Sequence, residues 1–182
     1  MKQMLQVPDG DLVVQFQAGD DIAFVALYNR YKLSVYRFCL RMLGSGDSAK
    51  DVVQGIFVKV YERRLQIRSP ESFRSWLFTV ARNDCLTSLR HAGDRVCLAD
   101  EATAHLATEH HYDDAAGIVN AGLAHLAPGD REVLLLREYE NLTYRQIAEV
   151  LSISESAVKS RLFTARRRIF EILKPIMHER KD

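Results

Sequence analysis

Apolar residues in the first ninety positions recur at intervals of three and four, and no stretch alternates apolar with polar residues as a β-strand would. This spacing predicts helices over residues 9–17, 20–43, 48–64 and 72–90. Helix-breaking sequences separate them: Gly19-Asp20, the turn from Gly44 to Asp47, and Ser69-Pro70-Glu71. The second and third helices each carry one apolar stripe, which we assign to the core of a helical bundle rather than to a cofactor site: Leu27, Tyr31, Val35, Phe38 and Met42, then Val53, Phe57, Val60 and Tyr61.

Residues 142–169 have the pattern of a helix-turn-helix, two helices joined by a tight turn. In the first helix Ile147, Ala148 and Leu151 share an inward face, and the hydroxyl of Thr143 stands where it can cap the helix. The turn runs from Ser152 to Ser154, and Ser154 can cap the second helix in the same way. The second helix has an inward stripe of its own: Val158, Leu162, Ala165 and Ile169.

The opposite face of this second helix is polar and basic, which predicts a DNA-binding surface. It presents Ser156, Ser160, Phe163 and Arg167, flanked by Lys159 and Arg166. Residues 154–181 hold eight basic and three acidic residues, a net charge of +5 in a chain whose total is +1. Such a helix fits the major groove, where its cations neutralise phosphates. A solvated basic face is the alternative, but the preceding helix and tight turn favour DNA binding.

Two residues depart from the common helix-turn-helix pattern. Ser152 stands where many such turns have Gly, and Arg161 stands where many recognition helices have an aliphatic residue. Leu162 takes over the inward role.

A second basic region covers residues 59–90, with seven basic and three acidic residues interleaved with Phe73, Trp76 and Phe78. Aromatic rings and guanidinium groups suit unpaired bases, which stack on them or enter a small pocket. Packing of the last helix is the alternative, and for Trp76 we favour packing. The polar loop at residues 67–72 is the better candidate for DNA, because its proline exposes it. At the start of the third helix, Asp51 and Gln54 are candidates for contact with a protein partner.

The remaining composition indicates two domains and an intracellular setting. The 182 residues suffice for two small cores, and residues 91–116 hold six acidic residues against one basic, with no sustained apolar period, as a flexible linker would. Three widely spaced cysteines indicate reduced thiols rather than disulfides. The sequence predicts no membrane span and no signal peptide, hence a cytoplasmic protein.

One cluster in the acidic segment contains residue types that can bind a metal. His105, His110 and His111 lie near Glu109 and Asp113, which leaves a metal-dependent hydrolase as a distant alternative. The cluster lacks the helical i, i+4 frame that positions two ligands, so we expect no metal, no other cofactor and no catalytic residues.

Three runs together resemble a bacterial RNA polymerase sigma factor of the extracytoplasmic-function (ECF) type: AKDVVQGIFVKVYERR, RSPESFRSWLFTVARN, and the block from LAPGDREVLLL to the end of the helix-turn-helix. The resemblance implies an all-α fold with sigma domain 2 over residues 1–91, an acidic linker over 92–116 and sigma domain 4 over 117–182. It implies a factor that joins core polymerase and selects promoters without enzymatic activity. A stand-alone helix-turn-helix regulator is the nearer alternative.

The resemblance also implies roles for individual residues. Core polymerase, through its beta-prime and beta subunits, would be bound by Asp51, Gln54, Phe57 and Val58. The −10 element would be opened and captured by Ile67, Arg68, Ser69, Pro70, Glu71 and Ser72, with Arg74 and Asn83. The −35 element would be read by Ser156, Lys159, Ser160, Arg161, Phe163, Arg166 and Arg167.

The family further implies an anti-sigma factor as a partner, which can itself be anchored in a membrane that this chain does not enter. It also suggests that the acidic linker mimics nucleic acid in the polymerase cleft, whereas a plain solvated tether remains the alternative. Lys159 stands where relatives often have Arg, which makes phosphate contact easier to expect than bidentate reading of guanine.

Overall fold

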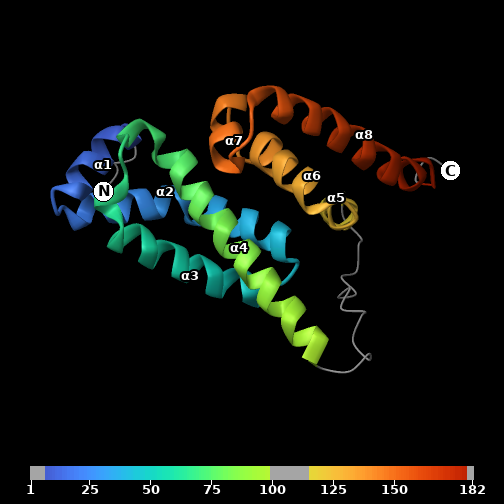
Figure 1. Ribbon diagram of the computed structural model, residues 1–182, viewed down its shortest axis with the longest axis horizontal. Coiled ribbons are helices and arrows are strands. Elements are labelled where there is room, and N and C mark those ends of the chain that lie inside the picture. The colour runs from blue at the N-terminus through green and yellow to red at the C-terminus, as the bar shows by residue number, and fades with distance from the viewer. Residues whose placement is uncertain (1–6, 99–114, 180–182) are drawn as a thin grey trace. The chain divides into compact units, whose positions relative to one another are not determined.

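The computed structural model describes residues 7–98 and 115–179, and the chain divides into two compact units (Figure 1). Within the described residues the regular secondary structure is helical throughout, as the sequence predicted. In that same part of the chain, no helix is both long and apolar enough to cross a bilayer.

The N-terminal unit is built from four α-helices and two short 3-10 turns. They are α1 (Asp9–Gln17), α2 (Asp21–Leu43), α3 (Gly46–Glu62), η2 (Arg64–Gln66), η3 (Pro70–Ser72) and α4 (Phe73–Leu98). The bounds of the first three helices agree with the sequence prediction to within two residues. Helix α3 begins earlier than predicted because the side chain of Ser45 accepts a hydrogen bond from the amide of Ser48, 3.3 Å away, and so caps the helix ahead of Gly46.

Helix α2 supplies the centre of this unit's core. All five residues of its predicted stripe are buried, and Phe38 and Tyr31 contact Phe78 and Phe73 of α4 edge to face at ring-centroid distances of 5.5 and 5.6 Å. An ion pair of 2.5 Å between Lys59 and Asp84 joins α3 to α4. Phe73 is fully buried, so for this residue the expectation of stacking on unpaired bases is wrong and the alternative, packing of the last helix, is right.

The stripe predicted for α3 is partly wrong. Phe57 and Val60 are buried, but Val53 is only partly buried and Tyr61 is 39% exposed, and Ile56, which the prediction left out, is fully buried. Tyr61 lies outside the core because its hydroxyl donates a hydrogen bond of 2.9 Å to the carboxylate of Asp21 near the surface, and this bond raises the pKa of Tyr61.

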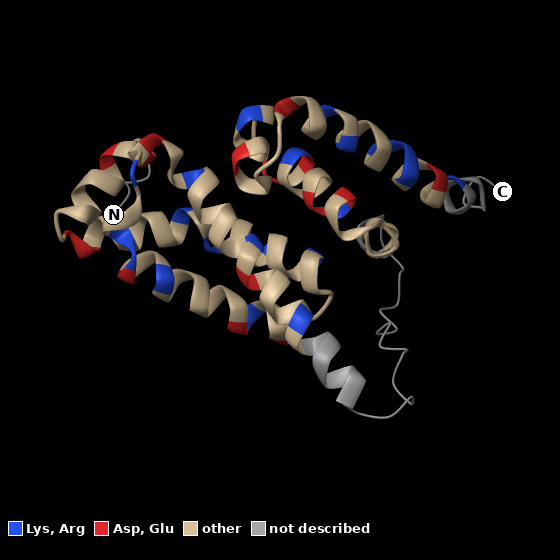
Figure 2. Cartoon of the chain, in the orientation of Figure 1, with Lys and Arg blue, Asp and Glu red and all other residues tan. Residues whose placement is uncertain are grey.

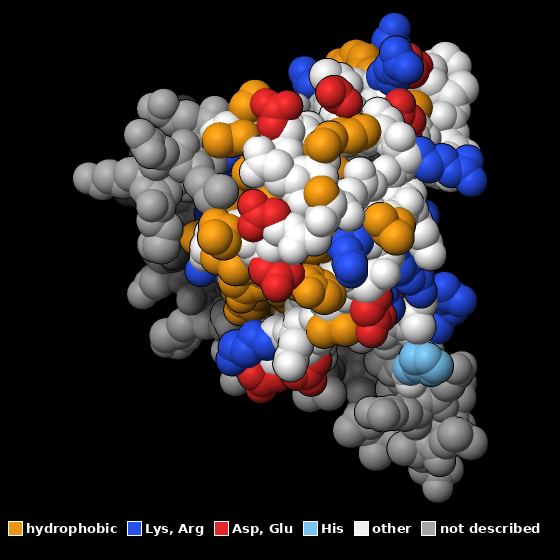
Figure 3. Space-filling view, turned by 90° about the vertical axis from the view of Figure 1, so that its left-hand side faces the viewer, with side chains coloured by type: hydrophobic (Ala, Val, Ile, Leu, Met, Phe, Trp, Pro, Cys, Tyr) orange, Lys and Arg blue, Asp and Glu red, His pale blue; other side chains and the backbone are white. Residues whose placement is uncertain are grey.

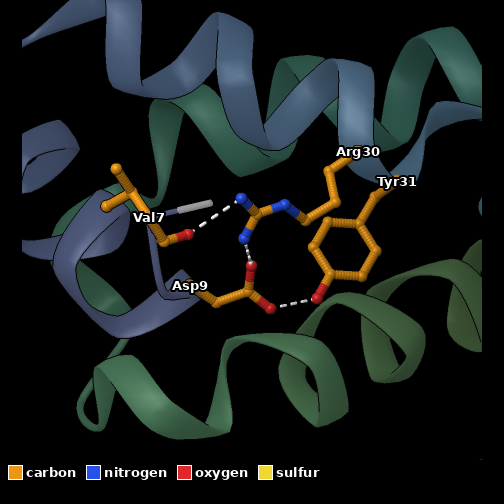
Figure 4. A network of polar contacts seen from close by, with 4 residues as sticks. All are labelled: Val7, Asp9, Arg30 and Tyr31. Atoms are coloured by element: carbon orange, nitrogen blue, oxygen red, sulfur yellow. Dashed lines mark hydrogen bonds and ion pairs between the residues drawn. The ribbon is translucent and has the colours of Figure 1, made fainter. Parts of the chain in front are cut away.

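A polar network holds α1 on α2 (Figure 4). The carboxylate of Asp9 accepts hydrogen bonds from the guanidinium of Arg30 and the hydroxyl of Tyr31, and Arg30 also donates to the carbonyl of Val7 at 2.8 Å. Burial and the hydrogen bond to Asp9 raise the pKa of Tyr31, so its phenol stays protonated and remains a donor. The start of α1 is therefore fixed to the middle of α2.

The C-terminal unit contains α5 (Ala115–Ala124), α6 (Pro128–Leu134), a π-helical turn η4 (Leu135–Tyr139), α7 (Tyr144–Leu151) and α8 (Glu155–Glu179), with α5 and α6 packed on α8. The guanidinium of Arg131 donates to the carbonyls of Leu123, Ala124 and Leu126 at 2.8, 2.7 and 3.3 Å, which satisfies the end of α5. Because α4 extends to Leu98 and α5 begins at Ala115, helix occupies both ends of the segment we assigned to the linker. The domain limits remain predictions, and residues 99–114 lie outside the described part of the chain.

Helices α7 and α8 form the predicted helix-turn-helix. Thr143 and Gln146 make a capping box, in which the Thr143 hydroxyl accepts from the Gln146 amide at 3.2 Å and the Gln146 side chain accepts from the Thr143 amide at 2.9 Å. Ser154 caps α8 through a 3.2 Å bond from the amide of Ala157. Ile147, Leu151, Val158, Leu162 and Ala165 are buried as expected.

The turn places Ser152 in the left-handed region, with φ of 53°, at the position where we noted that many such turns have Gly. This conformation costs an L-residue roughly 1–2 kcal/mol because its Cβ crowds the following carbonyl, and Gly avoids that crowding.

We therefore expect Ser152→Gly to stabilise the C-terminal unit by about 1 kcal/mol. Amide hydrogen exchange, resolved by residue, should slow across α7 and α8. Ser152→Ala is the matched control, since it removes the same hydroxyl but keeps the Cβ. Equal exchange rates in the two variants would show that the turn is not strained.

Candidate functional site

An apolar groove of about 760 Å³ lies between α2 and α3 in the N-terminal unit. Its floor includes Phe57, whose ring meets Tyr28 edge to face at 4.8 Å, and its rim includes Val58, which is 51% exposed. The groove is lined by Phe24, Val25, Tyr28, Tyr36, Lys50, Val53, Gln54, Phe57, Val58, Tyr61 and Glu62. Exposed apolar side chains also gather between charged ones on the face seen in Figure 3.

Three of the four residues expected to bind polymerase line this groove, namely Gln54, Phe57 and Val58. The fourth, Asp51, is exposed on α3 three residues before Gln54, so the two polar side chains share one face of the helix. Phe57 is only 5% exposed and is reached from inside the groove. The chain thus combines a large apolar contact area with a carboxylate and an amide beside it.

The loop between α3 and α4 folds into the turns η2 and η3 rather than an open polar loop. Arg68, Ser69 and Glu71 are exposed, and Pro70 and Ser72 are partly buried. The expectation of exposure is wrong for Ile67, whose side chain is 3% exposed. An apolar side chain gains about 1.5–3 kcal/mol when it leaves water, so Ile67 acts as an anchor for the loop.

Two further residues expected near this loop lie on α4. Arg74, one turn from η3, is partly buried, and Asn83 is exposed farther along the helix. The loop and α4 together therefore present Arg68, Ser69 and Asn83 to solvent.

Helix α8 presents all seven residues that we expected to contact duplex DNA. Ser156, Lys159, Ser160, Arg161, Phe163, Arg166 and Arg167 are exposed, and Phe163 is 70% exposed despite its apolar ring. Figure 2 shows Lys and Arg spaced along this helix.

The charged groups of α8 have partners that the sequence did not indicate. The carboxylate of Glu138, on η4, accepts two hydrogen bonds from Arg166, at 3.0 Å from Nε and 2.6 Å from Nη2, and this contact raises the pKa of Arg166. The ring of Tyr144 lies under both Lys159 and Arg137, whose charged groups are 5.9 and 5.1 Å from its centroid. Elements preceding α8 therefore orient its Lys159 and Arg166.

Two expectations fall outside the described residues. The acidic residues of the linker from Asp100 to Asp114 lie there, as do His105, His110 and His111 of the candidate metal cluster.

Comparison with known families matches both units. Residues 27–95 match the model for sigma-70 region 2, which includes the loop and all of the groove lining except Phe24 and Val25. Residues 117–169 match the model for sigma-70 region 4, which includes α7 and the first part of α8.

Similar proteins span almost the same length. The chain is 29% identical to the RNA polymerase sigma-H factor of Pseudomonas aeruginosa, with 97% of this chain and 99% of that protein covered. It is 30% identical to the ECF RNA polymerase sigma-E factor of Haemophilus influenzae, with 94% and 98% covered, and 29% identical to that of Escherichia coli K12, with 94% and 97% covered.

Solved structures share the fold at 24% identity. One is CnrH in complex with the cytosolic domain of CnrY, with a TM-score of 0.70 and coverage of 92% of this chain and 97% of that one. Another is the sigma factor RpoE in complex with the anti-sigma factor NepR from Bartonella quintana, with a TM-score of 0.72 and coverage of 83% and 96%.

Two helical units that match regions 2 and 4 define a transcription initiation factor of the sigma-70 class. The chain belongs to the ECF RNA polymerase sigma factors. It therefore works with core polymerase to start transcription at specific promoters. The family consists of DNA-binding initiation factors and not of known enzymes. A stand-alone regulator is disfavoured, because it does not account for region 2.

Proposed function

We propose that this sigma factor docks on core polymerase through the groove of α2 and α3, captures the −10 element with the loop before α4, and reads the −35 element with α8. The observation that carries the proposal is that the loop and the α3 side of the groove fall within the region 2 match, while the exposed basic face of α8 falls within the region 4 match.

The chemistry of the groove supports its assignment to polymerase. Stable protein interfaces combine a dry apolar centre with a polar rim, and Phe57 and Val58 would supply the centre. Asp51 and Gln54 would supply the rim, where a carboxylate and an amide can accept hydrogen bonds from arginines of a partner helix. The coiled coil of the beta-prime subunit, which the family resemblance implies, is such a partner.

The loop suits unpaired DNA. Opening a promoter costs a few kcal/mol for each base lifted from the stack, and a basic surface with a small receiving site offsets that cost. Arg68 can neutralise a phosphate, while Ser69 and Asn83 offer hydrogen bonds to a base edge.

Helix α8 suits duplex DNA. Arg166 is 52% exposed and Glu138 46% exposed, and an ion pair this open to water contributes only about 0–1 kcal/mol. A phosphate or guanine can therefore replace Glu138 as the partner of Arg166. Until then Glu138 pairs with the guanidinium of Arg166.

We further propose that an anti-sigma factor regulates this chain by covering the groove. The RpoE structure of similar fold is a complex with the anti-sigma factor NepR, and that of CnrH is a complex with the cytosolic domain of CnrY. A groove that polymerase must occupy is a site at which a competing protein blocks transcription.

Val58→Asp should weaken binding to core polymerase at least tenfold, because it places a charge in the apolar centre of the interface. Val14→Asp on α1 is the matched control, since Val14 is 55% exposed against 51% for Val58 and lies outside the groove. The affinity for core polymerase is measured with labelled chain for the Val58→Asp and Val14→Asp variants. Asp51→Ala combined with Gln54→Ala should act in the same direction by removing the polar rim. Equal affinities of the Val58 and Val14 variants would contradict docking through the groove.

Arg166→Ala should reduce holoenzyme affinity for a promoter duplex by about 1–3 kcal/mol, and the loss should shrink when the upstream element is scrambled. Arg168→Ala is matched in exposure, at 54% against 52%, and in pairing with a carboxylate, Asp130. We expect it to lower affinity for both duplexes alike. A uniform loss in the Arg166 variant would mean that this residue contacts phosphate alone.

A further inference from the structure

Helix α1 borders the loop between α3 and α4 at both of its ends. At the C-terminus of α1, the side-chain amide of Gln17 donates hydrogen bonds to the carbonyls of Arg64 and Ile67, at 2.8 and 2.9 Å. Near its N-terminus, a Cβ placed on Gly10 would lie 3.0 Å from Oε1 of Glu71 and 3.8 Å from Cβ of Pro70. One helix therefore contacts both η2 and η3.

The two carbonyls that Gln17 binds mark the start of the exposed loop. Arg64 opens the turn η2, and Ile67 follows it with a buried side chain. The next residues, Arg68 and Ser69, are exposed. A side-chain amide has two N–H donors, so Gln17 can serve both carbonyls at once, which a carboxylate or a thioether cannot do.

The helix that carries Gln17 is itself fixed. Asp9 binds Arg30 and Tyr31 of α2, and the ring of Phe16 stacks on Phe24 of α2 at a centroid distance of 5.1 Å. Helix α1 lies outside residues 27–95, which match the region 2 model. The support of the loop thus comes from a segment that the family match does not include.

We propose that α1 is a buttress for the −10 loop and that Gln17 is its positioning residue, holding the backbone at residues 64–67 so that Arg68 and Ser69 face unpaired DNA. The inference rests on the proposed function of that loop. Gln17 itself does not touch DNA. It acts by fixing the carbonyls from which the exposed part of the loop departs, so that the loop is already ordered when a base arrives.

The test uses full-length chain assembled with core polymerase. The promoter is selected by in vitro transcription of genomic fragments, and the probe is the single non-template strand across its −10 element. Gln17→Glu places a carboxylate against two carbonyl oxygens, and Gln17→Met keeps the length but removes the donors. Gln15→Glu makes the same chemical change at an exposed position of the same helix.

Both Gln17 variants should bind the single strand about fivefold or more weakly and open the duplex promoter more slowly, as permanganate reactivity of unpaired thymines would report. Gln15→Glu should match the wild type. Affinity for core polymerase should stay unchanged in all three variants, and each should still show a cooperative unfolding transition in the fluorescence of Trp76, the chain's one tryptophan, although the lost hydrogen bonds lower the midpoint of the Gln17 variants.

Two results would overturn the inference. One is single-strand affinity in the Gln17 variants equal to that of Gln15→Glu. The other is a parallel loss of core affinity or of the Trp76 transition, which would make Gln17 a support of the whole unit. The loop assignment is tested separately by Arg68→Ala combined with Ser69→Ala. If that pair leaves single-strand affinity unchanged, the proposed role of the loop fails, whatever the Gln17 variants do.

Discussion

The packing of α2 is the constraint on which the N-terminal unit depends. One stripe of this helix, from Leu27 to Met42, is buried against the other helices, and each large side chain in it contributes about 1.5–3 kcal/mol. The neighbouring face, with Phe24, Val25 and Tyr28, lines the groove. Because one rigid helix carries both faces, the groove can stay apolar and open without loss of the core. A change that moved α2 would move the groove, the seat of α1 and the contact with Phe73 together.

In the C-terminal unit the constraint is different, because several basic side chains lie close together on α8 in the absence of DNA. Like charges spaced along a helix repel, and long side chains lose conformational entropy when they are ordered. Glu138 and Tyr144 reduce both effects, since one pairs with Arg166 and the other lies under Lys159. These contacts are exposed and weak, so DNA can replace them. These contacts orient the side chains of Arg166 and Lys159 and add little to the stability of the unit.

The sequence predicted what depends on local periodicity and missed what depends on distant neighbours. The bounds of the first three helices and the exposed face of α8 followed from spacings of three and four, and the two caps of the helix-turn-helix followed from the hydroxyl residues Thr143 and Ser154. The end of α4 did not, since the helix runs to Leu98 and not to residue 90. The exposure of Tyr61 did not, because it depends on Asp21, 40 residues away. The burial of Ile67 does not follow from the local sequence either, because a polar loop that contains a proline is expected to be exposed throughout. The pairs of Gln17 with Arg64 and Ile67, and of Arg166 with Glu138, join residues 47, 50 and 28 positions apart. No local pattern marks such contacts.

A loop that captures unpaired bases gains from being ordered in advance. If it were ordered only on contact with DNA, roughly 1–2 kcal/mol of backbone entropy per residue would be subtracted from the binding that offsets base unpairing. In this chain the entropy cost of ordering the loop arises when the protein folds, because the buried side chain of Ile67 and the two hydrogen bonds from Gln17 fix the loop at that stage. Asp9 in turn binds α1 to α2, so the core fixes the position of α1, and α1 fixes the position of the loop. In the proposed role of the loop, the exposed residues Arg68 and Ser69 would need little further ordering, and more of their binding energy would be left to hold the strands apart.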